Sequence, residues 1–450
     1  MRDLTKAAFS LTWAMPLYGA QQLLRTFSPS EQDRQRATAS YDAVTGAVAE
    51  TLGDEEGTLR RLYQVGQCFQ NALLTMGPSF ITPQLLDPRV WADVTGEVAQ
   101  RSAEAARGLA RGAGSQMWRE IQDKGTVFCL VLEVSKLIHV PSEPPFPLYE
   151  LLARSYALGI FPALWAVEGL GHEYGDSFWN QGIKAPQGIL NDERTKDLPP
   201  ESLTMLHAGI GLSFAKNYMD SLGANPSDEE VRRMVEIVFQ LCRDNSRPGY
   251  VGAAYESLGL VARTFHPELV GPVDRAVRAV APDLLGFYWH GAGRAVFFAA
   301  INFLPGSDRF VFEMARDQAP DELARLNSVA GAAWAYTVVA QRNPRVLADL
   351  VIEPLGEELA RDGAFSNGVA SSSMMRFDTT PNAPFIETFL RYQPTDPRVA
   401  DLWQRLVRTP AETALNVYYP VLKRADRLGE IFRYQDLPAL VAGVRGAGAR

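Results

Sequence analysis

The stretch that decides the fold is residues 286–298, which read GFYWHGAGRAVFF. Two glycines separated by one residue lie here among aromatic side chains, a histidine and an arginine. The same Gly-x-Gly core recurs in residues 165–178 (WAVEGLGHEYGDSF) and 206–214 (LHAGIGLSF), and a degenerate copy with one glycine lies in residues 254–260 (AYESLGL). Recurrence of one pattern along the chain predicts a repeated structural unit.

A proline precedes each glycine core by about two to three helical turns. The pairs are Pro162 with Gly169, Pro200 with Gly209, Pro282 with Gly291 and Pro320 with Gly331. Proline is tolerated at the first helical position, because the N–H group that it lacks would have no partner there. The copies are about 35 to 48 residues apart, the length of a helix pair with its turns. Alternating β-branched runs bounded by turns do not appear, so we predict an all-α fold of stacked helical repeats, solenoid-like or toroid-like.

The glycines of these helices carry a cost that something must offset. Each glycine inside a helix destabilises it by about 1 kcal/mol relative to alanine. Because glycine has no Cβ, another helix or a flat ligand can lie directly on its backbone. Both alternatives stay open from the sequence. In either one, Gly169, Gly209 and Gly291 are expected on packed interior faces.

The best domain boundary is the run of residues 141–147, PSEPPFP, whose prolines cannot continue a helix. We therefore divide the chain into an N-terminal helical region, residues 1–140, and a helical-repeat domain, residues 141–450. Apolar residues recur at helical spacing between Leu59 and Phe69, which predicts an amphipathic hairpin or bundle. In composition this region resembles the phasins that coat hydrophobic granules. The alternative is an ordinary bundle that packs on the rest of the chain.

Charge and cysteine usage limit the partners. The 450 residues carry a formal net charge of −8 without an evident cluster of Lys and Arg, so nucleic acid is not expected as a partner. The three cysteines are far apart in apolar surroundings, which predicts buried thiols in a reducing compartment. No secretory signal is evident, and we predict a cytoplasmic protein. Residues 7–27 are apolar but interrupted by Pro16 and Arg25, so we expect the N-terminal helices at most to contact a membrane or lipid surface peripherally.

Three titratable residues in the first copy share one helical face. Glu168, His172 and Asp176 are four residues apart, so their side chains point into the same space. A desolvated glutamate can hold a proton at neutral pH, and its neighbours can adjust its proton affinity. We therefore predict these three as catalytic residues for proton transfer. The alternatives are exposed i,i+4 pairs or a metal site, but the spacing matches no zinc motif, and neither a metal nor a cofactor is predicted.

The later copy carries most of the residues predicted to bind substrate. His290 and Arg294 are one turn apart among aromatic residues, an arrangement that suits a large apolar molecule with a single polar end. The predicted substrate-binding residues are Trp165, Tyr288, Trp289, His290, Arg294 and Phe297. Core packing is the alternative for the aromatic residues. Glu256, aligned with Glu168 in the degenerate copy, is a second candidate acid, and His207 is expected to be a core histidine.

Residues 158–171, 256–267 and 286–294 resemble the UnbL-like family of bacterial proteins, which are found in enediyne-type and related natural-product gene clusters. The similarity covers about residues 150–345. It implies a setting in secondary metabolism with a polyene-like or otherwise apolar intermediate, and it assigns no catalytic residues. The N-terminal helical region departs from the short members of that family.

Two hypotheses of different classes follow. In the first, the chain is a cofactor-independent cyclase or isomerase of natural-product biosynthesis, in which Glu168 is the acid or base acting on a hydrophobic polyene or isoprenoid-like intermediate. In the second, it is a non-catalytic carrier or scaffold for such an intermediate or for a partner enzyme. A buried acid favours the enzyme, and solvated acids in an open groove favour the scaffold. We expect Glu168 and His290, at equivalent positions of two copies, to face one cavity.

Overall fold

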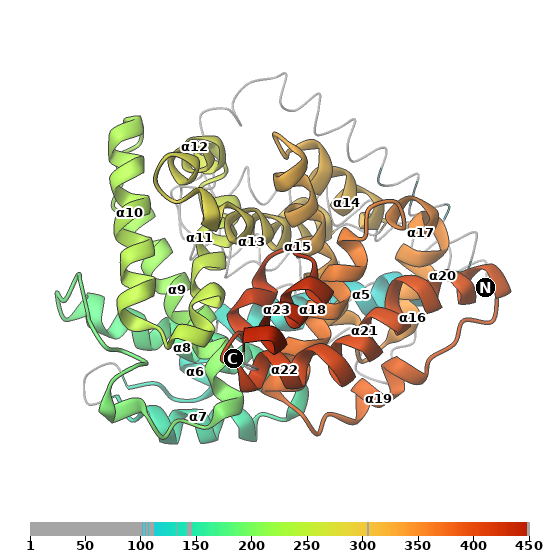
Figure 1. The fold of residues 1–450 in the computed structure, drawn as a ribbon, viewed down its shortest axis with the longest axis horizontal. Coiled ribbons are helices and arrows are strands. Elements are labelled where there is room, and N and C mark those ends of the chain that lie inside the picture. The colour runs from blue at the N-terminus through green and yellow to red at the C-terminus, as the bar shows by residue number, and fades with distance from the viewer. Residues whose placement is uncertain are drawn as a thin grey trace, which may run out of the picture. The chain divides into compact units, whose positions relative to one another are not determined.

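The computed structural model describes residues 112–132, 134–141, 146–303 and 306–447, together with Arg101, Glu104 and Arg107. Packing divides the chain into two units, residues 1–114 with 303–307 and residues 115–302 with 308–450. The predicted N-terminal hairpin or bundle, and its predicted contacts with a lipid surface, fall almost entirely outside the described residues. The fold given below is that of the second unit (Figure 1).

The described residues form helices and no strand, which confirms the predicted all-α class. The α-helices are α5 (Gly114–Leu132), α6 (Val134–Leu137), α7 (Leu148–Ala157), α8 (Ile160–Asn180), α9 (Leu203–Asp220), α10 (Asp228–Asn245), α11 (Val251–Phe265), α12 (Val270–Val280), α13 (Leu285–Phe297), α14 (Asp308–Asp317), α15 (Glu322–Ala340), α16 (Pro344–Leu347), α17 (Glu353–Leu359), α18 (Ala364–Thr379), α19 (Pro384–Arg391), α20 (Pro397–Trp403), α21 (Thr409–Thr413), α22 (Tyr419–Arg424) and α23 (Leu437–Ala447). Three π-helical turns, η9 (Ala348–Ile352), η10 (Gln404–Arg408) and η11 (Ala414–Tyr418), interrupt the later helices. Short 3-10 turns, η4 (Pro200–Ser202) and η7 (Pro282–Leu284) among them, lead into α9 and α13.

The unit begins before the proline run that marks the predicted domain boundary. Contacts group α5 and α6 with the later helices, and α6 packs on α8. A Cβ placed on Gly169 of α8 would meet the Val134 side chain of α6 at 2.7 Å. The division between the two units therefore falls near Gly114 rather than at residue 141.

Six helices form the centre of this unit in chain order. The most extensive helix contacts join α8 to α9, α9 to α11, α11 to α13, α13 to α15 and α15 to α18. The helices between them lie outside: α10 packs on α9 and α12, α12 contacts α11 and α13, and α14 packs on α15 (Figure 1). From α9 onward, an inner helix followed by an outer helical segment is the unit that repeats, as the spacing of the glycine cores predicted.

Inner and outer helices differ in their pattern of apolar residues. Every residue of α15 from Asn327 to Ala340 is buried, as are the residues of α9 from Leu203 to Ala215. In α10, by contrast, buried Val231, Val235 and Phe239 alternate with charged residues at helical spacing. A helix that is apolar on all sides belongs in a core, whereas an amphipathic helix covers one. The sequence of each helix therefore decides its layer.

Glycines allow the inner helices to pack with their backbones in contact. A Cβ placed on Gly209 of α9 would lie 2.1 Å from the carbonyl oxygen of Glu168 in α8, and one on Gly291 of α13 would lie 2.0 Å from that of Glu256 in α11. On Gly331 of α15 it would lie 1.9 Å from the carbonyl oxygen of His290. Real Cβ atoms do not approach other atoms this closely, so only glycine permits these helix spacings. The glycine faces thus contact neighbouring helices. Of the two partners that the sequence left open, another helix or a flat ligand, the structure shows a helix.

The last inner helix returns to the first two. The Asp378 Oδ2 atom of α18 accepts a hydrogen bond from Thr204 Oγ1 of α9 at 2.5 Å. Arg376 of α18 donates to the carbonyl oxygen of Phe161 in α8 at 3.4 Å. The stack of inner helices is thereby closed at the end where α8 and α9 begin and α18 ends, so the repeat is toroid-like there.

Candidate functional site

Four charged or titratable side chains form one buried cluster among the inner helices. Glu168 comes from α8, Glu256 from α11, and His290 and Arg294 from α13, and each is at most 4% exposed. The glycine contacts explain why they meet. Because Gly291 rests on the backbone of Glu256, and Gly331 on that of His290, the backbones carrying these groups are held side by side. We call these four residues the charge cluster.

Arg294 is the centre of the charge cluster. Its Nη2 atom donates to Glu168 Oε1 at 2.5 Å, and its Nη1 atom donates to Glu256 Oε2 at 3.1 Å. The other oxygen of Glu256 accepts a hydrogen bond from His290 Nδ1 at 2.8 Å. The guanidinium carbon lies 4.7 Å from the centre of the Trp334 ring in α15, a cation–π distance. One arginine is therefore shared by two carboxyl groups, and one of these also holds a histidine.

The two carboxyl groups differ in proton affinity. Burial raises the pKa of Glu168 above its ordinary value, although Arg294 opposes this effect. Burial acts in the same direction on Glu256, but Arg294 and His290 together outweigh it and hold the pKa of Glu256 below its ordinary value. Glu256 is therefore the ionised partner of Arg294. Glu168 is the carboxyl group more prone to keep a proton.

Three polar atoms of the charge cluster have no hydrogen-bond partner among the described residues. They are Glu168 Oε2, His290 Nε2 and Arg294 Nε. Buried polar atoms in folded proteins are hydrogen-bonded in the great majority of cases. Glu168 and His290 thus each keep one polar atom that no described residue engages.

Of the predicted catalytic trio, the structure places only Glu168 in the charge cluster. His172 and Asp176 lie one and two turns further along α8 and are 24% and 28% exposed, with 3.7 Å between His172 Nε2 and Asp176 Oδ2. Asp176 also accepts hydrogen bonds from Ser213 Oγ at 2.6 Å and Asn217 Nδ2 at 2.7 Å, both in α9. Among the described residues, no three His, Cys, Asp or Glu side chains gather as a metal site would require.

The predicted substrate-binding residues divide into two groups. His290 and Arg294 belong to the charge cluster, but the aromatic residues beside them face other helices. Tyr288 donates to the carbonyl oxygen of Val270, and Trp289 Nε1 donates to Asp274 Oδ1 in α12. The remaining two predicted aromatic residues, Phe297 and Trp165, contact Tyr336 and Phe161 respectively. Core packing, the alternative given for the aromatic residues, is what the structure shows for Tyr288, Trp289 and Phe297.

Arg294 was also expected to bind the polar end of a ligand. The ionised Glu256 already balances its charge and Glu168 accepts its remaining Nη2 hydrogen bond, so Arg294 is not free to bind an anion. His207, expected in the core, is fully buried and uses both ring nitrogens: Nδ1 lies 2.6 Å from the carbonyl oxygen of Leu203, and Nε2 accepts from the backbone N–H of Arg247.

Two residues near this interior were not singled out from the sequence. Trp334 lies three residues after Gly331 in the fourth proline-to-glycine copy, so the repeat itself could have indicated it. Arg376 lies in a serine-rich and methionine-rich segment that matches no copy of the pattern. Its place beside α8 depends on the return of α18 to that helix, and no local sequence pattern predicts this return.

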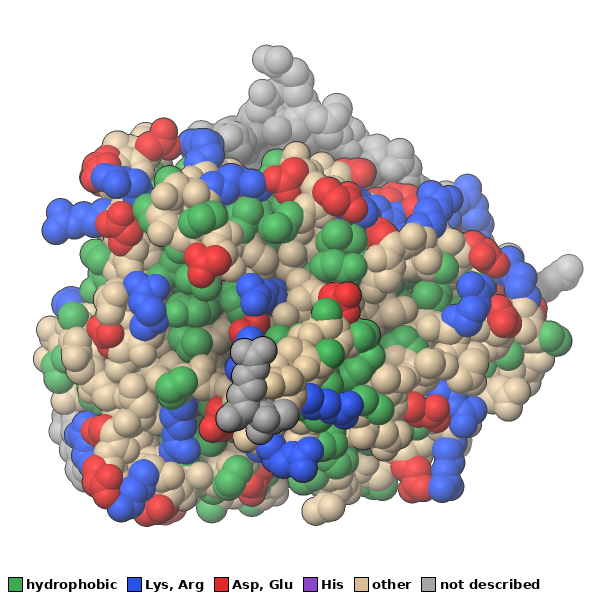
Figure 2. All heavy atoms as spheres, viewed as in Figure 1, with side chains coloured by type: hydrophobic (Ala, Val, Ile, Leu, Met, Phe, Trp, Pro, Cys, Tyr) green, Lys and Arg blue, Asp and Glu red, His purple; other side chains and the backbone are tan. Residues whose placement is uncertain are grey.

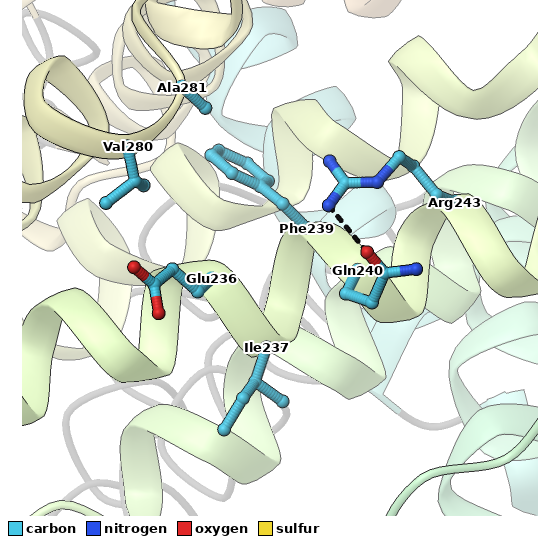
Figure 3. A pocket seen from close by; sticks show the side chains of 7 residues that line it. All are labelled: Glu236, Ile237, Phe239, Gln240, Arg243, Val280 and Ala281. Atoms are coloured by element: carbon cyan, nitrogen blue, oxygen red, sulfur yellow. Dashed lines mark hydrogen bonds between the residues drawn. The ribbon is translucent and has the colours of Figure 1, made fainter.

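A surface hollow of about 370 Å³ lies elsewhere, between α10 and the end of α12 (Figure 3). Glu236, Gln240 and Arg243 line it together with Phe239 and Val280, and Arg243 donates to Gln240 at 2.8 Å. It contains none of the predicted site residues, and Phe239 is the single aromatic residue of its lining, so it does not match the aromatic-lined cavity that we expected.

One face of the molecule, drawn in Figure 2, is mixed in charge. On the face shown in Figure 2, acidic and basic side chains of the described residues are interspersed, and neither sign forms a continuous patch. Among the described residues, no helix combines the length and apolarity that crossing a bilayer requires.

Comparisons with protein-family models, curated proteins and solved structures gave no match. The similarity to the UnbL-like family therefore stays a prediction.

Proposed function

We propose that the chain is a cofactor-independent enzyme that cyclises or isomerises a hydrophobic small molecule by acid and base catalysis in the charge cluster. The observation that supports this most is that the pKa values of two neighbouring carboxyl groups are shifted in opposite directions: that of Glu168 is raised and that of Glu256 is lowered. Environments that push paired titratable groups apart are typical of acid and base assignments in enzymes. Setting and substrate follow from the sequence similarity: natural-product biosynthesis with a polyene or isoprenoid-like intermediate.

Each member of the charge cluster has a role in this proposal. Glu168, protonated at Oε2, donates a proton to a carbon–carbon double bond of the substrate. In the neutral imidazole of His290, the proton on Nδ1 is held by Glu256, which leaves a lone pair on Nε2. That nitrogen removes a proton from the neighbouring carbon, so the double bond moves or a ring closes. Arg294 keeps Glu256 ionised and thereby orients His290.

Incorporation of deuterium from the solvent gives a direct test. In D₂O the proton on Glu168 exchanges for deuterium, so each turnover adds a single deuterium to the substrate carbon that is protonated. The full-length chain is incubated in D₂O with an organic-solvent extract of the cells that make it, and the extract is analysed by mass spectrometry. We expect a compound that changes its retention time and gains one deuterium.

Variants connect this product to the cluster. Glu168→Gln keeps the volume of the side chain but removes its proton, and we expect its rate to fall about 10²- to 10⁴-fold. Glu236→Gln on α10 is the matched control, because Glu236 lines the surface hollow, which contains no residue of the charge cluster. Full turnover by Glu168→Gln would refute the assignment. A compound that binds and is recovered unchanged and free of deuterium would instead support the carrier hypothesis.

A further inference from the structure

Arg376 of α18 is a buried cation without a counter-ion among the described residues. Its exposed fraction is 0%, and its Nε atom has no hydrogen-bond partner among them. Its two hydrogen bonds are long ones to backbone carbonyl oxygens, 3.4 Å to Phe161 and 3.3 Å to Val338. Arg294, which is 4% exposed, is paired with the two carboxyl groups of Glu168 and Glu256. Arg376 has no such carboxyl partner among the described residues.

Aromatic rings surround the Arg376 guanidinium. Its central carbon lies 5.0 Å from the centre of the Phe161 ring, 5.7 Å from that of Trp165 and 5.5 Å from that of Phe385. The rings attract a cation through their faces but do not neutralise it. The indole N–H of Trp165 is likewise buried without a partner among the described residues. The two donors without a partner among the described residues therefore belong to neighbouring side chains.

The charge near Arg376 does not balance. The guanidinium carbon of Arg342 also lies near Phe161, 3.5 Å from the centre of its ring, but Arg342 is paired with Asp123 at 2.6 Å. Burial, with Arg342 as a smaller contribution, lowers the pKa of Arg376 to about 9. Arg376 thus remains protonated at neutral pH, and among the described residues around it one positive charge has no counter-ion. Proteins pair buried charges, because isolation from water is costly.

We propose that Arg376, with the indole N–H of Trp165, binds the carboxylate of an apolar molecule. A carboxylate carries one negative charge and accepts two parallel hydrogen bonds from a guanidinium, so it matches both the surplus charge and the donors. A phosphate dianion would leave a second negative charge unpaired in the same surroundings. The rings of Phe161 and Phe385 would contact the hydrocarbon next to the carboxylate.

The site is near the surface of the unit. Phe385 in α19 is half-buried, and the Arg342 side chain is 35% exposed. Trp165 lies one turn before Glu168 on α8, which places the carboxylate site beside the charge cluster rather than within it. The inference goes beyond the proposed reaction, since it concerns binding alone and holds whether or not Glu168 transfers a proton.

Calorimetric titration of the full-length chain with dodecanoate at pH 7 tests the site. We expect Arg376→Met to weaken dodecanoate binding on the order of 10- to 100-fold, the usual effect of removing a hydrogen bond to a charged group. Arg376→Lys keeps the charge without the planar fork and should bind with intermediate affinity. Arg263→Met is the matched control, because Arg263 is a partly buried arginine of α11, and it should bind as the wild type does. Glu168→Gln should also bind normally, which separates this test from that of the proposed reaction.

Three outcomes would overturn the proposal. One is equal binding of dodecanoate by wild type and both Arg376 variants. Another is binding of the neutral analogue 1-dodecanol as tight as that of dodecanoate. The third is binding of inorganic phosphate that depends on Arg376 while that of dodecanoate does not. The melting temperature gives a second readout: without ligand, Arg376→Met should raise it, because an unpaired buried charge is removed, and a large decrease would show that the arginine is structural.

Discussion

The substitution Gly291→Ala tests the backbone contact between the two helices that carry Glu256 and His290. The new Cβ would lie 2.0 Å from the carbonyl oxygen of Glu256, whereas ordinary van der Waals contact begins at 3.4 Å. The helices α11 and α13 would have to separate by about 1.4 Å, the difference between these distances. Such a shift would lengthen the hydrogen bonds from Glu256 to His290 and Arg294, now 2.8 and 3.1 Å, beyond the bonding range.

Three energies decide the size of this effect. Overpacking of a well-filled core costs about 1–3 kcal/mol. Weakened hydrogen bonds to charged groups add about 1.5–3 kcal/mol each. Replacing glycine by alanine inside a helix returns only about 1 kcal/mol. We therefore expect Gly291→Ala to lower the free energy of unfolding by about 3 kcal/mol or more.

The assay is urea unfolding followed by circular dichroism, with the midpoint and slope compared between variants. Gly443→Ala is the matched control, because Gly443 is an exposed glycine inside α23 with no other atom within 4 Å of a Cβ placed on it. The same chemical change should stabilise the chain there by up to about 1 kcal/mol. If Gly291→Ala unfolds at the same urea concentration as the wild type, the argument from helix contact is wrong.

Further predictions concern buried groups. Arg294→Met should destabilise the chain by about 3–5 kcal/mol in urea unfolding, because it leaves Glu168 and Glu256 buried without their cation, and an unchanged midpoint would contradict the pairing. Burial lowers the pKa of His207 from 6.5 to about 4. Between these pH values the folded chain therefore binds fewer protons than the unfolded chain. The stability linked to this shift, about 3 kcal/mol, is present above pH 6.5 and is lost as the pH falls through 4. His207→Gln should flatten that part of the pH dependence of unfolding. Burial also raises the pKa of the Cys242 thiol to about 12, so iodoacetamide at pH 8 should label it, as followed by peptide mass spectrometry, only as fast as the chain opens, and rapid labelling of the native chain would contradict its burial.

The repeat was predictable from the sequence because it depends on local features. Proline before a helix and glycine within it have the same physical effect in every copy, and their spacing gives the length of a helix pair. The position of Glu168 and His290 before their Gly-x-Gly cores placed them in one buried cluster, since each glycine lies against the backbone of a neighbouring helix. Glu256 followed from the same alignment of copies.

The directions of the side chains could not be predicted in the same way. An inner helix such as α13 is apolar on all sides, so its sequence does not indicate which face meets an outer helix. Tyr288 and Trp289 were assigned to the ligand, but they bond to α12. Arg376 depends on a contact with Phe161, 215 residues away in sequence, and only the return of α18 creates it. Long-range closure of this kind leaves no trace in local periodicity.

The contacts of glycine with backbone carbonyl groups make the spacing of the inner helices independent of the side chains in the charge cluster. Because main-chain atoms set the spacing between α8, α9, α11, α13 and α15, a change of side chain at Glu168, Glu256 or His290 does not alter that spacing. Natural selection can therefore exchange the chemistry of the interior by single substitutions at these positions while the scaffold is inherited intact. A glycine of the contact positions has no such freedom, because a side chain there would push apart the two helices that meet at it.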